Sequence, residues 1–125
     1  MSDRPRALVV DDDDAVRRAV GHLLERSCDV VSADGVRTAV EILERDEGLD
    51  IILSDMAMHD GSGIDLYEWV CQHRPALQQR MVFMSGGGST TEARRFLAET
   101  APYRLDKPFR LADLEAVVTK ASNGA

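Results

Sequence analysis

The sequence predicts an α/β fold in which one parallel sheet of five strands carries helices on both faces. Short apolar segments recur along the chain, and amphipathic segments of helical period separate them. Strands that alternate with helices of this length form βαβ units, whose parallel strands are joined by right-handed crossovers. The segment Asp50–Asp55 (DIILSD) contains a continuous apolar run, which is typical of a strand buried on both faces of a parallel sheet.

The size and composition are those of one globular domain. The chain has 125 residues, so we expect a single domain over residues 1–125 with a core that needs no disulfide or metal. It is 44% hydrophobic and 30% charged. No apolar run approaches the roughly 20 residues of a membrane helix, and the polar start at Met1–Arg6 is unlike a signal peptide.

Cysteine content and charge narrow the function classes. Cys28 and Cys71 lack a CxxC spacing, so we expect reduced, unpaired thiols in a cytoplasmic protein. The net charge of -7 argues against direct binding of nucleic acid, because phosphate contacts require clustered lysine and arginine.

The first half of the chain supplies three strands and two helices. The predicted strands are Arg6–Asp11, Cys28–Ala33 and Asp50–Asp55. Four adjacent aspartates end the first strand, and Asp12 or Asp13 can cap the helix that follows, where acids favour the positive end of the helix dipole. The apolar faces of the two helices are Val16, Val20, Leu23 and Leu24, and then Val36, Ala39, Val40 and Leu43, with the second helix ending near Gly48.

The second half begins with a polar, glycine-rich loop at His59–Gly63 and supplies two more strands, Arg80–Ser85 and Pro102–Asp106. The third helix is marked by Leu66, Trp69 and Val70, with Ile64 as a further candidate, and is ended by His73-Arg74-Pro75. A short fourth helix covers Thr90–Thr100 with Ala93, Phe96 and Leu97 inward, and the last helix is marked by Leu111, Leu114, Val117 and Val118.

Five such units predict a flavodoxin-like doubly wound (βα)5 sandwich with strand order 2-1-3-4-5. In this order the first and third strands are neighbours at the switch point, and ligands of such sheets bind at the carboxyl ends of the strands. Asp11 and Asp12 end the first strand, Asp55 the third and Ser85 the fourth, while Lys107 follows the fifth. We therefore expect these five side chains to meet in one crevice.

Three carboxylates in one crevice require a positive partner. At ~4 Å and an effective dielectric constant of ~20, each pair repels by roughly 4 kcal/mol, so one acid takes up a proton or a cation lies among them. Asp11, Asp12 and Asp55 offer hard oxygen ligands, which favour Mg²⁺. With Lys107 this metal would neutralise an incoming phosphoryl group, Asp55 would be the nucleophile, and Ser85 would offer a hydroxyl to a phosphoryl oxygen.

The order and spacing of four motifs resemble the receiver domain of two-component response regulators. The motifs are LVVDDD, SDMAMHDGSG, FMSGG and DKPF, and together they span the whole chain. The resemblance implies that Asp55 is the phosphoacceptor and that Asp11 and Asp12 hold Mg²⁺. It also implies that Ser85 is the switch hydroxyl and Lys107 the phosphate-binding lysine.

The resemblance further implies a ligand, a backbone geometry and a partner. The backbone carbonyl of Ala57, two residues after Asp55, would also bind the metal. The Lys107–Pro108 bond is expected to be cis, although only about 5–6% of X–Pro bonds in folded proteins are. The phosphoryl donor would be a histidine kinase or a histidine phosphotransfer protein. The domain would phosphorylate and dephosphorylate itself on Asp55 without being a conventional enzyme.

The sequence departs from the receiver pattern at two places. His59 stands where the family usually has proline, and Arg104 stands at the position of the aromatic switch residue, with Tyr103 adjacent. Coupling of Ser85 to a rotating tyrosine is then lost or runs through a shifted residue. The segments FMSGG, RRFL and YRLDKPF look most like receivers attached to hybrid histidine kinases.

Two alternatives are open at this point. A haloacid-dehalogenase-like phosphatase also uses aspartate, a hydroxyl, lysine and Mg²⁺, but its nucleophile lies on the first strand as DxDxT, and no threonine follows Asp11-Asp12-Asp13 here. The other alternative is a receiver-like module that binds partners without phosphorylation. Taken singly, Asp11 and Asp12 also fit a capping turn, and Lys107 fits a solvated lysine. The glycines at 86–88 match neither GxGxxG nor GxxxxGK[ST], so a nucleotide loop is disfavoured.

Overall fold

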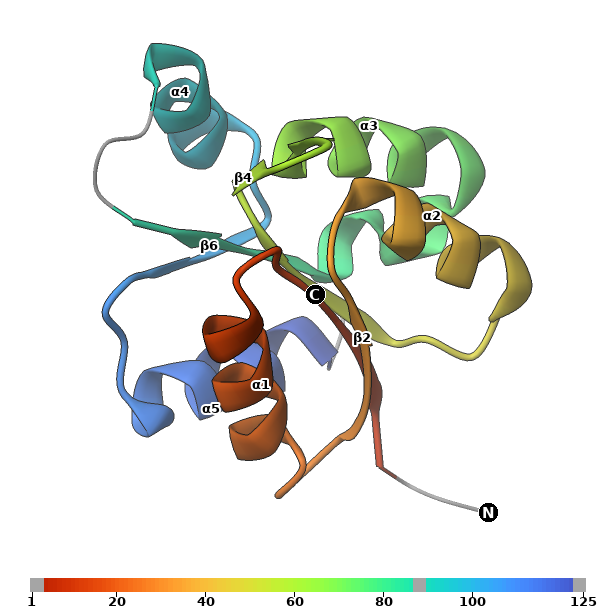
Figure 1. Cartoon of the computed structure of the whole chain (residues 1–125), viewed down its shortest axis with the longest axis vertical. Helices are drawn as coiled ribbons and strands as arrows, with labels where there is room; N and C mark the ends of the chain where they lie inside the picture. Colours follow the sequence, from red (N-terminus) through yellow and green to blue (C-terminus); the bar gives the residue numbers. More distant parts are fainter. Residues whose placement is uncertain (1–3, 87–89, 123–125) are drawn as a thin grey trace.

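A computed structural model describes residues 4–86 and 90–122, in which a five-stranded parallel sheet lies between two layers of helices (Figure 1). The strands of this sheet are β1 (Arg6–Val10), β2 (Asp29–Ala33), β3 (Ile51–Asp55), β6 (Met81–Ser85) and β7 (Tyr103–Asp106). The helices are α1 (Asp14–Leu24), α2 (Val36–Arg45), α3 (Gly63–His73), α4 (Thr91–Glu99) and α5 (Leu111–Ser122). The predicted α/β class and the predicted alternation are confirmed.

The strand order is β2-β1-β3-β6-β7, which is the predicted order 2-1-3-4-5. The register aligns Val10 of β1 with Ser54 of β3, so the residues that follow, Asp11 and Asp55, lie side by side. On the other side of β3, Asp55 aligns with Met84, one residue before Ser85. The switch point between β1 and β3 therefore carries the acids that the sequence placed there.

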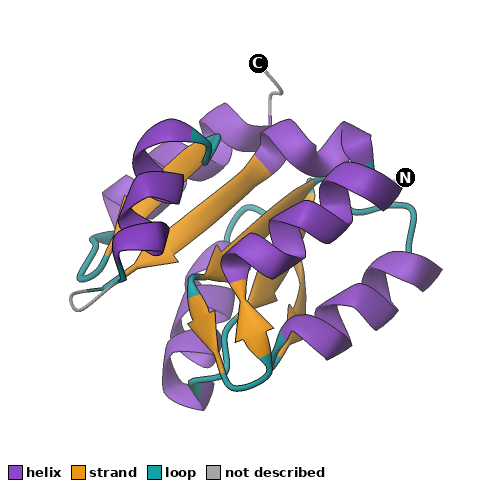
Figure 2. Ribbon diagram, turned by 90° about the horizontal axis from the view of Figure 1, so that it is seen from above, coloured by secondary structure: helices purple, strands orange, loops and turns teal. Residues whose placement is uncertain are grey.

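The two faces of the sheet pack separate halves of the core, and Figure 2 shows the sheet between its two helical layers. One cluster joins alternate strand residues such as Leu8, Ile52 and Phe83 to α2, α3 and α4. The other joins their neighbours Val9, Leu53 and Val82 to α1 and α5. Because successive residues of a strand face opposite layers, β3 is buried on both sides, as predicted.

Side chains next to each helix explain where the helices begin. Asp13, one of the two predicted caps, accepts hydrogen bonds from the backbone N–H groups of Ala15 and Val16 at the start of α1. Ser62 and Asp65 form a reciprocal capping box at the start of α3. Thr90, which the sequence assigned to the fourth helix, is instead its cap.

Two predicted loops contain structure that the sequence analysis missed. A short antiparallel hairpin of β4 (Ala57–Met58) and β5 (Gly61–Ser62) overlaps the loop expected at 59–63, and α3 begins at Gly63. A 3₁₀ helix, η1 (Pro75–Arg80), precedes β6. Both are too short to give a periodic pattern. The predicted glycines Gly87 and Gly88 lie outside the described residues.

Smaller expectations have mixed outcomes. Cys28 and Cys71 are both free thiols, as expected. The Lys107–Pro108 bond is cis, as the resemblance implied. Trp69 is only half-buried and stacks on His73, with ring centroids 4.4 Å apart, so it lies at the margin of the core rather than inside it. None of the helices in the described part of the chain has both the length and the apolar character needed to cross a bilayer.

Candidate phosphoacceptor and metal site

Lys107 lies between two of the predicted acids. Its Nζ is 3.2 Å from Oδ1 of Asp55 and 3.4 Å from Oδ2 of Asp11. The lysine follows β7, and its backbone N–H donates to the carbonyl oxygen of Ser85 at 2.7 Å, which continues the strand pairing up to the site. Lys107 thus forms one ionic cluster with Asp11, which is 96 positions earlier in the chain, and with Asp55, which is 52 positions earlier.

The three aspartates converge as predicted. Each of Asp11, Asp12 and Asp55 places a carboxylate oxygen within 4.8 Å of the others. Asp11 is fully buried, and its Oδ1 accepts a hydrogen bond of 2.9 Å from the backbone N–H of Asp13, which fixes the carboxylate at the end of β1. The side chain of Asp12 is partly exposed and lies 3.8 Å from Nδ1 of His59.

The electrostatics of the site favour an additional cation. Burial raises the pKa of the Asp55 carboxyl above its ordinary value, and Asp11 adds to this, although Lys107 acts in the opposite direction. Burial alone would lower the pKa of Lys107, but Asp55 and Asp11 outweigh it, so the pKa of the lysine is raised. The lysine is therefore charged at neutral pH, while ionised Asp55 is disfavoured by its surroundings.

The donor set fits a divalent metal ion. Three ionised carboxylates and one ammonium leave two negative charges in the crevice. All the carboxylate donors are hard oxygens, which suit Mg²⁺. Ala57, the fourth predicted ligand, begins β4 two residues after Asp55. Asp11, Asp12 and Asp55 are thus the residues that could hold the ion, and the Ala57 carbonyl stays a prediction.

Ser85 borders the site without contacting the carboxylates through a hydrogen bond. It is the last residue of β6, its side chain is almost fully buried, and its hydroxyl lies 3.4 Å from the carbonyl oxygen of Gly86. A cavity of about 320 Å³ opens beside it, lined by Lys107 together with Arg94, Leu97, Arg104 and Asp106. The hydroxyl and the lysine therefore share one concave surface next to Asp55.

The two candidates for the switch position lie on opposite faces of β7. Arg104 lines the cavity beside Ser85, and its guanidinium pairs with Asp106 at 2.9 Å. Tyr103 packs in the cluster of α1 and α5, and its hydroxyl is 3.3 Å from the carbonyl oxygen of Lys120. The adjacent tyrosine therefore does not replace the missing aromatic residue, and Arg104 occupies that place beside Ser85.

The loop after Asp55 is held by a contact that the sequence analysis did not identify. Asp60 accepts hydrogen bonds from the backbone N–H groups of Val36 and Arg37, at 2.9 and 3.0 Å, and so caps α2 from outside its own segment. The N-cap residue Gly35 provides no side-chain cap, and a Cβ there would lie only 2.6 Å from Asp60 and 2.9 Å from His59. The two loops therefore approach closely at Gly35, and a larger residue there would displace the side chains of Asp60 and His59.

Glycine at the start of α3 has a similar role. A Cβ on Gly63 would lie 2.7 Å from the backbone oxygen of Asp55, and the Gly63 N–H donates to the carbonyl oxygen of Met56. The first turn of α3 therefore packs directly against the backbone of the candidate phosphoacceptor.

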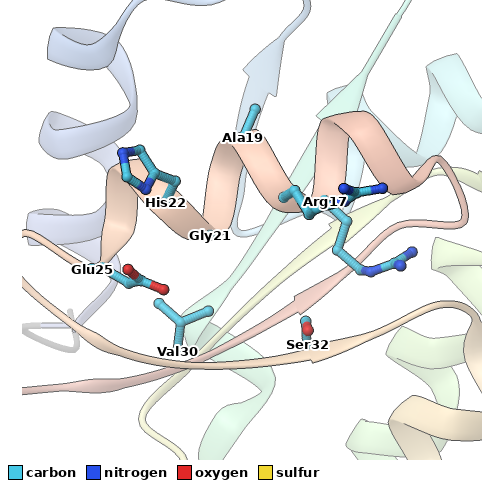
Figure 3. A pocket seen from close by; sticks show the side chains of 8 residues that line it. Arg17, Ala19, Gly21, His22, Glu25, Val30 and Ser32 are labelled. Carbon is cyan, nitrogen blue, oxygen red and sulfur yellow. The ribbon is translucent and has the colours of Figure 1, made fainter.

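A separate groove lies between α1 and β2, away from the acids (Figure 3). It is lined by Arg17, Arg18, Ala19, Gly21, His22, Glu25, Val30 and Ser32, and none of the predicted site residues lies on its wall. This groove is therefore separate from the cluster of Asp11, Asp12, Asp55 and Lys107.

Fold and site together define a flavodoxin-like domain with an acidic crevice at its switch point. A family model for the response regulator receiver domain matches residues 7–119. The chain belongs to this receiver-domain family, as the four sequence motifs predicted.

Individual relatives agree with this assignment. The chain is 36% identical to the response regulator protein PilR of Pseudomonas aeruginosa over 94% of its own length but only 26% of the relative's. It is 32% identical to the two-component response regulator ORR3 of Oryza sativa over 93% of its own length and 89% of the relative's. A response regulator receiver protein from Pseudomonas putida superposes with a TM-score of 0.81 at 31% identity, covering 96% and 99% of the two chains.

Proposed function

We propose that this chain is a phosphoacceptor module of a two-component phosphorelay, in which Asp55 takes a phosphoryl group from phosphohistidine with the help of Mg²⁺. The donor would be a histidine kinase or a histidine phosphotransfer protein, as is general for receiver domains. The observation that carries the proposal is the placement of Lys107 between Asp55 and Asp11, next to a partly exposed Asp12. With a divalent cation bound among the three acids, this arrangement would accept the negative charge of a phosphoryl group.

The chemistry uses the chain's own groups in defined roles. A carboxylate oxygen of Asp55 attacks the phosphorus of a phosphohistidine whose other ring nitrogen carries a proton; an O–P bond forms, the P–N bond breaks with its electron pair going to the ring nitrogen, and histidine leaves as neutral imidazole. Bound Mg²⁺ would neutralise charge on the phosphoryl oxygens. Lys107 would bind one phosphoryl oxygen, and the Ser85 hydroxyl would donate a hydrogen bond to another.

The negative charge of a phosphoryl group on Asp55 would attract the side chains of Lys107 and Ser85. A phosphoryl group adds ≈ -1.5 to -2 charge and three acceptor oxygens. Lys107 already spans Asp55 and Asp11, so a phosphoryl group on Asp55 would offer it a stronger partner in the same place. Binding of Ser85 and Lys107 to that group would shift the α4–β7 surface between two populations.

The test is phosphorylation with acetyl phosphate or phosphoramidate and Mg²⁺, followed by intact mass, on wild type and Asp55→Asn. The proposal expects a gain of one phosphoryl group that depends on Mg²⁺ and is absent in the variant. Asp14→Asn is a matched control, because this exposed acid lies on α1 outside the cluster. If neither small donors nor a panel of histidine kinases phosphorylates the wild type, binding without phosphorylation becomes the better function.

The phosphatase alternative has less support. It needs the nucleophile on the first strand, whereas the acid nearest to Lys107 is Asp55 at the end of β3. The match to the receiver family over residues 7–119 argues in the same direction. An enzyme of that kind would turn over phosphate esters, so the absence of sustained turnover in the same assay separates the two functions.

A further inference from the structure

Strand β2 forms an outer edge of the sheet. It is the last strand in the order β2-β1-β3-β6-β7 and pairs with β1 alone. On that side, the N–H group of Asp29 and the carbonyl oxygen of Ala33 form hydrogen bonds to residues that flank β1. Because the backbone groups of successive strand residues point to opposite edges, those of Val30 and Ser32 point away from β1. In the described part of the chain, neither residue has a backbone partner on this outer side.

The opposite edge of the sheet is protected against a further strand, whereas β2 is not. The N–H group of Lys107 pairs with the end of β6. By the same alternation, the backbone groups of Arg104 and Asp106 in β7 point outward. Both residues are charged, and prolines at 102 and 108 flank the strand. Charged side chains and prolines are usual means by which edge strands avoid pairing. The outward residues of β2 are uncharged, and its sequence DVVSA contains neither proline nor lysine.

A groove beside this edge has room for the side chains of an added strand. It lies between α1 and β2, has a volume of about 600 Å³, and has Val30 and Ser32 on its wall. The facing side of α1 contributes the small residues Ala19 and Gly21, and a Cβ on Gly21 would lie 3.6 Å from the side chain of Val30. Neighbouring strands lie about 4.8 Å apart, so every second side chain of a strand paired with β2 would enter this groove.

The groove carries more positive than negative side chains. Arg17, Arg18 and His22 line it, together with the acid Glu25. The guanidinium of Arg17 is engaged in an ion pair with Asp14. Arg18 is exposed and forms no ion pair among the residues that the structure describes. In a chain whose net charge is -7, this groove is a local cationic surface that complements a carboxylate.

We propose that β2 accepts an extended peptide of a partner protein as an additional antiparallel strand, with an acidic side chain directed at Arg18. In Figure 3, Arg17 and Ser32 lie at one end of the groove, and Glu25 and Val30 lie at the other. The acid of the peptide therefore aligns with Ser32, and an apolar side chain two residues later aligns with Val30. Hydrogen bonds to the peptide backbone give the affinity, and the two side chains in the groove give the specificity.

A second copy of the chain is a poorer occupant of this edge. Antiparallel pairing of two β2 strands would bring two cationic grooves together and join two chains that each have a net charge of -7. The edge is also separate from the phosphoacceptor site, because none of the residues that line the groove belongs to the acidic cluster. Asp55→Asn should bind the peptide as wild type does, so this inference and the proposed function can fail independently.

The probe is the labelled peptide STETVTS, in which glutamate and valine occupy the two positions that face the groove. Its binding to the full chain is measured by fluorescence anisotropy, with a dissociation constant expected below about 1 mM. The peptide STKTVTS should bind at least about threefold more weakly at low salt, because its lysine would face Arg18. N-methylation of the glutamate and valine amides, which face β2, should abolish binding. N-methylation of two threonine amides, which face away from β2, should not.

Hydrogen exchange followed by nuclear magnetic resonance locates the bound peptide. At saturation, the peptide should slow the exchange of the Val30 and Ser32 amides at least about tenfold, because these N–H groups gain partners. The amide of Val31 points to β1 and is already paired, so its exchange should change much less. This contrast between adjacent residues reports pairing at the outer edge, which binding of the peptide elsewhere on the domain does not mimic.

Two variants test the edge and the charge from the side of the protein. Arg18→Glu should weaken STETVTS binding at least about fivefold at low salt and strengthen STKTVTS binding. Arg37→Glu is the matched control, because it reverses an exposed arginine on α2 outside the groove, and it should keep wild-type affinity for both peptides. Ser32→Pro removes an outward N–H group and should abolish binding, and an edge position of this kind tolerates proline in the fold.

Four results would overturn the inference. The first is no binding of STETVTS to wild type at about 1 mM. The second is unchanged affinity after N-methylation of the amides that face β2, which needs no protein variant. The third is a bound peptide that leaves exchange at Val30 and Ser32 unchanged. The fourth is equal affinity for STETVTS and STKTVTS, which would remove the assignment of an acidic partner.

Discussion

Removing the charge of Lys107 should destabilise the metal-free protein strongly. At the observed separations of 3.2 Å from Asp55 and 3.4 Å from Asp11, an effective dielectric constant of ~20 gives a gross attraction of about 5 kcal/mol for each pair. The cost of burying the ammonium offsets much of this, because burial alone disfavours the charged lysine. Loss of one partner from a buried ionic cluster typically costs ~3–5 kcal/mol.

Lys107→Met keeps the apolar stem and deletes the charge, so we expect the free energy of unfolding in EDTA to fall by about 3 kcal/mol. The assay is guanidinium unfolding followed by circular dichroism. Saturating Mg²⁺ should recover most of the loss, because the ion neutralises the same carboxylates. The difference should also shrink as the pH falls through the raised pKa of Asp55, since a protonated acid no longer needs the lysine.

Arg104→Gln is the control for this experiment. Its ion pair with Asp106 is exposed on both sides, so the variant should lie within about 0.5 kcal/mol of wild type. The electrostatic reasoning is refuted if Lys107→Met unfolds at the wild-type midpoint in EDTA. An equal loss with and without Mg²⁺ would refute it too, because the effect would then lie in packing.

Three other substitutions test the site and its supports. Asp55→Asn should raise the melting temperature of the metal-free protein by about 2–4 °C, because ionised Asp55 is disfavoured by its surroundings, and should remove most of the stabilisation by Mg²⁺; scanning calorimetry with and without the ion measures both. Asp60→Ala should cost about 1 kcal/mol at pH 7 through loss of the cap on α2. Backbone hydrogen bonds lower the pKa of Asp60, so its contribution is present above its ordinary pKa and lost as the pH falls through the lowered value; equal deficits at pH 7 and pH 2.5 would contradict this. Ser62→Ala should cost about 1 kcal/mol by opening the capping box with Asp65, and a thermal melt that matches wild type would show that the box contributes nothing.

The sequence was sufficient for the sheet and for the convergence of the site. Apolar runs and helical periods specify which segments pair and pack, and one strand order then brings the ends of β1, β3, β6 and β7 to the same edge. Once this strand order is fixed, Asp11 after β1 and Asp55 at the end of β3 must lie close together. The metal ligands and the phosphoryl transfer stay predictions, because they concern groups that bind to the chain.

What the sequence did not reveal depends on contacts between distant segments. From the sequence, Asp60 is an ordinary turn residue. It caps α2, which begins more than 20 residues earlier in the chain, only because the fold brings its loop against the start of that helix. The same holds for Arg6, whose guanidinium binds both carboxylate oxygens of Asp46, 40 residues further along the chain. Neither pair has a local pattern, so periodicity and turn chemistry could not identify them.

The charge balance of the site explains why Asp55 and Lys107 should have opposite effects on the stability of the domain. Asp11 is completely buried, an environment that ordinarily excludes a carboxylate unless it is paired. The fold tolerates it because Lys107 and the backbone of Asp13 bind it, and because the ends of β1 and β3 are anchored by core on both faces. Deleting the acceptor charge at Asp55 should therefore stabilise the domain and deleting Lys107 should weaken it. Lys107 supplies one positive charge between Asp55 and Asp11, so one acid at the switch point stays unbalanced in the metal-free protein.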